Sequence, residues 1–140
     1  NTNSDPVESR FTIWQVATNN MHTIIPIANC ISFHPSYSPD GKQIVFESDN
    51  GSDHGIYIIN SDGTGLRRLL YDRIRRQVNK PVPAGSIEFT NPAWHPDGRH
   101  IVYQYIELTK TKPGYSGIDG EGYTTTYLLD VAQALAINKP

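Results

Sequence analysis

Cysteine, long hydrophobic runs and concentrated charge are all scarce in this sequence. Cys30 is the single cysteine in 140 residues, which excludes an intramolecular disulfide and a zinc site built from cysteines. Its apolar neighbours predict a buried, unreactive thiol. The 37% hydrophobic content suffices for the core of one domain, but no run approaches the roughly 20 apolar residues that span a membrane.

Charge is low and balanced, with 12 basic and 14 acidic residues and a net charge of -2. Proteins that bind nucleic acid or an anionic bilayer usually concentrate basic residues on one surface. We therefore expect neither a nucleic-acid partner nor a membrane span. Ten prolines, eleven glycines and 10% aromatic residues are instead typical of a chain rich in strands and turns.

A duplicated segment organises the chain. The core of Ser36–Leu69 recurs at Ala93–Tyr105, and the matched Asp40 and Asp97 set the period at 97 − 40 = 57 residues. In each copy an aromatic residue precedes a Pro-Asp-Gly turn, and an alternating apolar run follows, which predicts a β-hairpin. The structural turn residues are Pro39, Asp40, Gly41, Pro96, Asp97 and Gly98. Two further strands after the first hairpin would complete the four-stranded sheet of a propeller blade.

The first copy contains SPDGK, IVF, IYIINSDGTG and RRL in order, and this pattern resembles the TolB-type β-propeller repeat. That WD-like blade is also found in tricorn and prolyl-oligopeptidase-type propellers. The second copy matches as far as Tyr103 and then departs through an insertion. The resemblance implies an all-β chain of four-stranded antiparallel blades, protein or peptide binding, and a periplasmic or extracellular location.

The expected organisation is about two and a half blades. The segments are an N-terminal tail at 1–10, the third and fourth strands of a partial blade at 11–30, a complete blade at 31–70, an interblade loop at 71–86, a second blade at 87–137 with an insertion at 107–123, and a C-terminal tail at 138–140. The residues at 131–137 have helical character, which makes a fourth strand there doubtful. Because a closed propeller needs about four blades or more, we expect the ring to be incomplete and to be closed by remaining blades of a parent chain or by other subunits.

Long connections fall on one face of the expected blades. Strands alternate in direction, so interblade loops and loops between second and third strands leave from the same face, opposite the Pro-Asp-Gly turns. Binding residues are expected on these loops. The candidates are Tyr71, Arg73, Arg75, Arg76 and Lys80 in the first loop, and Lys110, Lys112, Tyr115, Asp119, Glu121 and Tyr123 in the second. Arginines pair with carboxylates or phosphates, and tyrosines recognise proteins or sugars; a solvated basic face and a flexible loop are the alternatives.

Motifs for catalysis or metal binding are weak. The stretch GYSGI at 114–118 lacks the last glycine of a G-x-S-x-G elbow, and Asp119 with Glu121 lacks the rest of a calcium loop. The five histidines have no H-E-x-x-H or H-x-x-x-H spacing, so any metal site would have to be assembled by the fold. We therefore predict no catalytic residue, no cofactor and no metal ligand.

Three functions remain open. The first is a non-catalytic propeller segment that binds a protein or peptide through the face with the long loops. The second is the propeller portion of an enzyme, either a peptidase of the prolyl-oligopeptidase or tricorn type or an oligogalacturonate-lyase-like protein. The third is a structural subunit of a larger assembly.

Overall fold

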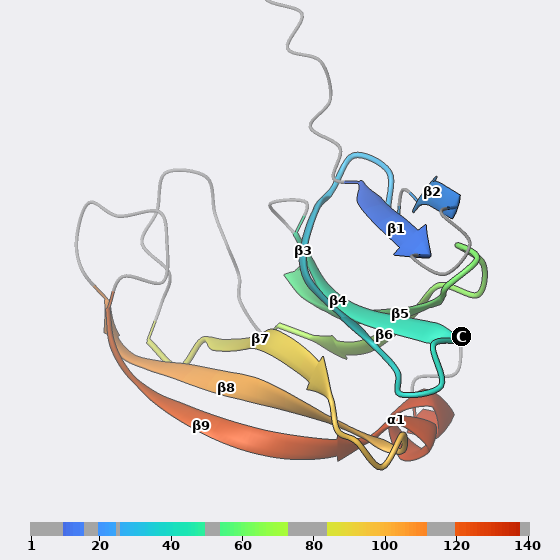
Figure 1. Ribbon diagram of the computed structural model, residues 1–140. Coiled ribbons are helices and arrows are strands. Elements are labelled where there is room, and N and C mark those ends of the chain that lie inside the picture. The colour runs from blue at the N-terminus through green and yellow to red at the C-terminus, as the bar shows by residue number, and fades with distance from the viewer. Residues whose placement is uncertain are drawn as a thin grey trace, which may run out of the picture.

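Three antiparallel sheets follow one another along the chain in the computed structural model, which describes residues 10–15, 20–24, 26–49, 54–72, 84–111 and 120–137 (Figure 1). The first pairs β1 (Phe11–Gln15) with β2 (Asn20–Ile24). The second contains β3 (Ile31–Tyr37), β4 (Gln43–Asp49), β5 (His54–Asn60) and β6 (Arg67–Tyr71) in that order. The third contains β7 (Ile87–Trp94), β8 (His100–Thr111) and β9 (Gly120–Asp130), followed by the helix α1 (Val131–Ile137). The predicted all-β class of propeller blades in an incomplete ring is confirmed.

The helix α1 begins directly after β9, where the sequence predicted helical character instead of a fourth strand. Alanine and leucine favour the helix, and α1 packs against β6 of the neighbouring sheet. Val131 and Ala134 are its buried residues. Within the described residues no helix combines the length and the apolar character needed to cross a bilayer.

The insertion at 107–123 was interpreted as a loop, and this is wrong for its described ends. The strand β8 continues to Thr111, β9 begins at Gly120, and Lys110 pairs with Glu121 in the antiparallel register. The glycines and charged residues of this segment do not indicate a strand. Strands form because threonine and tyrosine favour them and because the backbone groups of β8 and β9 pair with each other. The β8–β9 hairpin therefore extends beyond the first residue of β7, Ile87, which pairs with Glu107 of β8.

The two Pro-Asp-Gly turns have the same geometry in both copies. Gly41 and Gly98 have φ of 71° and 66°, in the left-handed region that glycine adopts without strain. The carboxylates of Asp40 and Asp97 accept the backbone N–H two residues later at 3.1 Å and 2.9 Å. These contacts fix the hairpin register.

Substitution of Asp97 with asparagine is expected to change the response to acid. Hydrogen bonds from the side chain of His100 and from the backbone of Arg99 and His100 hold the pKa of Asp97 well below its usual range. A lowered folded-state pKa means that the carboxylate stabilises the fold above its unfolded pKa of about 3.9, and that this contribution is lost as the pH falls through the folded value. The wild type should therefore melt above Asp97→Asn at pH 7, and the gap should narrow below about pH 4. Circular dichroism melts from neutral to acid pH test this, and a gap independent of pH would contradict it.

A second repeated feature is a bulge near the middle of the first strand of each sheet, β3 and β7. His34 and Asn91, 91 − 34 = 57 residues apart, both have φ of 52°, and both precede proline. Each side chain reaches the neighbouring strand: His34 Nδ1 lies 3.0 Å from Glu47 Oε2, and Asn91 Nδ2 donates to Gln104 Oε1 at 2.8 Å. Glu47 and Gln104 are also 57 residues apart, so the repeat includes a side-chain clamp as well as a turn.

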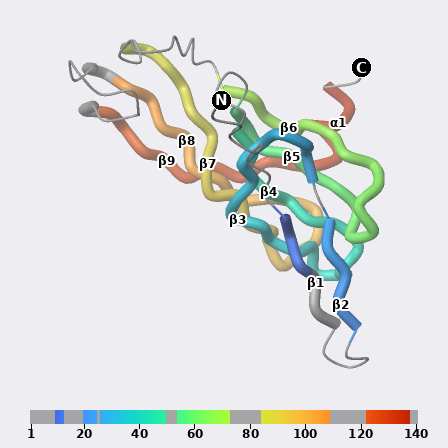
Figure 2. The backbone as a smooth tube through the Cα atoms, turned by 90° about the horizontal axis from the view of Figure 1, so that it is seen from above, coloured from blue at the N-terminus to red at the C-terminus, as the bar shows by residue number. Residues whose placement is uncertain are grey.

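The second sheet is buried on both faces, because it lies between the other two sheets (Figure 2). Alternation along β4 directs Ile44 and Phe46 toward the first sheet and Val45 and Glu47 toward the third. Cys30 is buried, as its neighbours predicted.

Candidate functional site

A cluster of buried polar side chains lies between the second and third sheets. Glu47 comes from β4, His54 opens β5, Asp72 follows β6, and Glu88 lies in β7. Their side chains are only 3 to 7% exposed. Charged groups at this depth need close partners, because burial alone strongly disfavours them.

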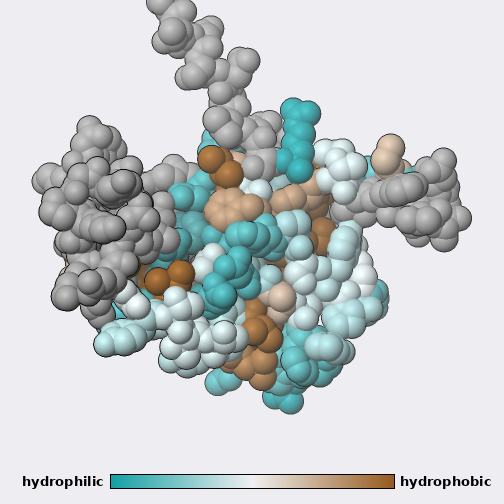
Figure 3. Space-filling model, turned by 60° about the vertical axis from the view of Figure 1, so that its left-hand side comes forward, coloured by the Kyte–Doolittle hydropathy of each residue, from teal (hydrophilic) through white to brown (hydrophobic). Residues whose placement is uncertain are grey.

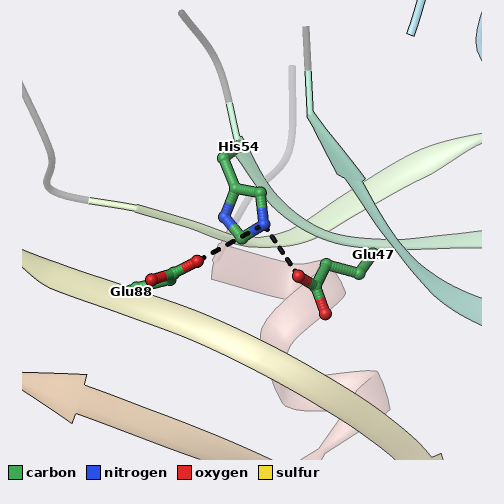
Figure 4. Close-up of side chains that lie close together, drawn as sticks. All are labelled: Glu47, His54 and Glu88. Atoms are coloured by element: carbon green, nitrogen blue, oxygen red, sulfur yellow. Dashed lines mark hydrogen bonds and ion pairs between the residues drawn. The ribbon is translucent and has the colours of Figure 1, made fainter. Parts of the chain in front are cut away.

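His54 stands at the centre of the cluster, and both of its ring nitrogens face carboxylates. Nδ1 is hydrogen-bonded to Asp72 Oδ2. Nε2 lies 2.9 Å from Glu47 Oε1 and 3.8 Å from Glu88 Oε1 (Figure 4). Burial would lower the pKa of His54, but the hydrogen bonds and charges of Asp72 and Glu47 raise it to about 10. An ionised carboxylate can only accept a hydrogen bond, so the two contacts favour the ring that is protonated on both nitrogens.

Glu47 connects the second sheet to the third. Its Oε2 accepts hydrogen bonds from Thr90 Oγ1 at 2.7 Å and from the backbone N–H of Asn91 at 3.0 Å, in addition to the contact with His34. Burial raises the pKa of Glu47, but the hydrogen bonds, led by that of His54, outweigh it and leave the pKa below its ordinary value. The ionised carboxylate thus receives donors from three strands.

Asp72 is held in place from both sheets. Its backbone N–H donates to the carbonyl oxygen of His54 at 2.9 Å, and its Oδ1 accepts the backbone N–H of Phe89 at 2.8 Å. These contacts leave Oδ2 directed at the His54 ring. The orientation of that ring is therefore set by residues on both sides of the interface.

The cluster lies at one end of the sheets. His54 pairs with Asp49 where β4 gives way to β5, and Gly55 pairs with Tyr71 at the end of β6. The Pro-Asp-Gly turns lie at the other end (Figure 1). This is the end from which the sequence predicted the long connections to leave.

Only some of the predicted binding residues fall in the described structure. Tyr71 is 51% exposed and Tyr123 is 71% exposed. Lys110 and Glu121 lie opposite each other in the β8–β9 hairpin. The remaining predicted residues lie outside the described ranges: Arg73, Arg75, Arg76, Lys80, Lys112, Tyr115 and Asp119.

Tyr71 also lines an apolar cleft between the second and third sheets. The cleft has a volume of about 270 Å³, and its walls come from β6, β7, β9 and α1. The lining residues are Leu69, Leu70, Tyr71, Phe89, Leu129, Ala134 and Ile137. Among the residues coloured by hydropathy in Figure 3, the hydrophobic ones form separate patches between polar ones.

The sequence prediction missed the polar cluster, although one signal was present. Glu47 directly follows the three apolar residues 44–46 in β4, a strand whose residues 44–48 are all buried. A carboxylate that continues a buried strand needs a buried partner. No role was assigned to His54 from the sequence, and no spacing along the chain joins it to Asp72 or Glu88.

Solved structures of acylaminoacyl peptidases resemble this chain. An acylaminoacyl peptidase in complex with Z-Gly-Gly-Phe-chloromethyl ketone matches with a TM-score of 0.61 and 15% identity over 91% of the chain. The Pyrococcus horikoshii acylaminoacyl peptidase matches with a TM-score of 0.59 and 14% identity over 91% of the chain. Acylaminoacyl peptidases have a β-propeller domain. The chain therefore has the fold of propeller blades.

The matched region is a small part of those peptidases, since the chain spans 19% of the length of each. No family model matches the chain. The likeness therefore concerns the fold, and the resemblance to the TolB-type repeat stays a prediction.

Proposed function

We propose that this chain is a non-catalytic β-propeller segment that binds a peptide in the apolar cleft between its second and third sheets. The cleft itself is the observation that carries the proposal. At about 270 Å³ it lies just below the roughly 300–1,000 Å³ typical of small-molecule pockets, so it suits one or two side chains of a peptide. The half-exposed ring of Tyr71 adds an aromatic surface, and Arg68 Cζ lies 4.9 Å from its centre.

The likeness to acylaminoacyl peptidases supports a wider setting for the segment. In this proposal the blades belong to the propeller portion of a peptidase, and a separate domain carries the catalytic groups. One of the two matched peptidases was solved with a peptide-like chloromethyl ketone, which fits a protein class that handles peptides. The TolB-type resemblance and the periplasmic or extracellular location remain part of the proposal.

A role as one part of a larger assembly is favoured by the outer face of the third sheet. Leu128 is 55% exposed, whereas Ile58, its counterpart 128 − 58 = 70 residues earlier, is 1% exposed. The two residues occupy the same register position, opposite Val102 and Val45 respectively. The third sheet covers Ile58, and a further blade of a parent chain or of another subunit would cover Leu128 in the same way.

Replacing Tyr71 with alanine is expected to weaken peptide binding about tenfold, because a partly buried aromatic contact of about 1.4 kcal/mol is lost. The probe is a fluorescein-labelled, N-acylated tripeptide with a phenylalanine side chain, titrated with the purified protein and followed by fluorescence polarisation. Since Tyr71 is half exposed, the variant should keep the wild-type melting temperature. Tyr37→Ala removes an aromatic residue of similar exposure, 43%, at the opposite end of the second sheet and should bind like the wild type.

Equal affinity of Tyr71→Ala and the wild type would remove the cleft from the proposal. Hydrolysis of a chromogenic N-acyl amino-acid anilide by the purified chain would instead contradict its non-catalytic part. The two outcomes are independent, so the binding site and the absence of catalysis are tested separately.

A further inference from the structure

We infer that the buried cluster is a binding site for one divalent transition-metal ion, Zn²⁺ or an ion of similar chemistry, with Glu47, His54 and Glu88 as ligands. Three donor atoms, His54 Nε2 and one carboxylate oxygen of each glutamate, lie within 4.8 Å of one another. In the close-up the dashed lines from the two carboxylates meet at one nitrogen of the ring (Figure 4). The spacing of histidines along the chain predicted no such site, because the fold brings the donors together from β4, β5 and β7.

The distances suit a small ion after minor shifts. Zinc takes nitrogen and oxygen donors at about 2.0–2.2 Å, so neighbouring donors of a tetrahedral site lie roughly 3.4 Å apart. The distances from His54 Nε2 to the Glu47 and Glu88 oxygens are 2.9 Å and 3.8 Å, one on each side of that value. A mixed imidazole and carboxylate set favours zinc and its neighbours over magnesium or calcium, which prefer oxygen alone.

Residues outside the ligand set already orient the donors. A metal-binding histidine usually donates its other ring N–H to a carboxylate, and His54 Nδ1 is bonded to Asp72 in this way. Thr90 and Asn91 hold Oε2 of Glu47, which leaves Oε1 directed at the ring. Two of the three ligands, His54 and Glu47, are therefore held in the orientation that coordination requires.

Nε2 of His54 faces Glu47 Oε1, to which it donates a hydrogen bond. Binding of the ion would release that proton to solvent and form the metal–nitrogen bond, while the proton on Nδ1 would stay between His54 and Asp72. A divalent charge then replaces a single one beside three carboxylates, those of Glu47, Asp72 and Glu88. The bound ion would tie the second sheet to the third.

Metal titration of the whole protein tests this inference. After treatment with EDTA and gel filtration, we expect one equivalent of Co²⁺ to give visible absorption bands of a bound ion, and Zn²⁺ to displace it. Glu88→Gln replaces a charged carboxylate ligand with a weakly coordinating neutral amide and keeps the contacts of His54 with Glu47 and Asp72, so the metal affinity should fall at least about tenfold. The double variant His95→Ala/His100→Ala removes two surface histidines beside Asp97 and should bind like the wild type.

Nitrogen-15 NMR of the wild-type histidines gives a measurement that requires no variant. The inference predicts that Zn²⁺ moves the Nε2 signal of His54 from a protonated to a metal-bound shift. It is overturned by a ring that stays doubly protonated with Zn²⁺ in excess, by absence of stoichiometric binding, by unchanged affinity in Glu88→Gln, or by loss of binding in the surface-histidine variant.

Discussion

Replacing His54 with alanine should lower the free energy of unfolding by about 3–5 kcal/mol, the range for breaking a buried ion pair by removing one partner. The loss is large because the variant leaves Glu47 and Asp72 ionised and buried, without the imidazolium on which both converge. Water does not replace the lost interaction of these two carboxylates, since both side chains are 3% exposed. Urea denaturation followed by circular dichroism measures the effect.

The control for this prediction is a histidine on the surface. His95→Ala removes a side chain that is 45% exposed and contacts Asp97 at 3.1 Å, and it should cost less than about 1 kcal/mol. A double-mutant cycle between His54→Ala and Glu47→Gln should give a coupling of at least about 1 kcal/mol, because the two groups touch directly. If His54→Ala lowered the free energy of unfolding as little as His95→Ala does, or if the two substitutions in the cycle had additive effects, the cluster would contribute little to stability.

Much of the fold was accessible from the repeat. The duplicated Pro-Asp-Gly turn predicted a β-hairpin in each copy, and the structure pairs β3 with β4 and β7 with β8 across these turns. The β8–β9 hairpin was less accessible. Its residues around 107–123 are polar and glycine-rich, and their strand pairing depends on the partner strand more than on local preference.

The polar cluster could not be predicted as a unit. Glu47, His54, Asp72 and Glu88 are separated by 7, 18 and 16 residues, so no local period relates them. Antiparallel pairing brings the first three to one end of the second sheet, and face-to-face packing with the third sheet adds Glu88. Each residue alone has an ordinary interpretation, and the chemistry arises only from their convergence.

The repeated clamp shows how one position changes with its surroundings. In the second sheet the pair is His34 with Glu47, and the carboxylate gains further donors from Thr90 and Asn91 of the sheet that covers it. In the third sheet the matched pair is Asn91 with Gln104, a neutral pair on the uncovered face. The buried position holds a carboxylate because enough hydrogen-bond donors surround it. At the position near water, a neutral amide is enough to form the pair.

Phe46→Ala is expected to cost about 3–5 kcal/mol, the usual loss when a buried phenylalanine is truncated. Phe46 is 0% exposed, meets Phe11 edge to face at 5.4 Å between ring centres, and stacks on Tyr57 at 5.9 Å. Its removal would open a cavity where the first sheet packs on the second, and rigid strands on both sides limit how far that cavity can collapse. Urea denaturation again provides the measurement.

Tyr123→Ala is the matched control for Phe46→Ala, because it truncates another aromatic residue in a strand. Its side chain is 71% exposed, so the free energy of unfolding should change by no more than about 0.5 kcal/mol. The comparison separates burial from ring size as the cause of the loss. A loss below about 1 kcal/mol for Phe46→Ala would mean that the first sheet does not cover this ring in solution, because a buried phenylalanine cannot be truncated so cheaply. A full loss would establish that β1 and β2 belong to the same cooperative unit as the blade that follows them.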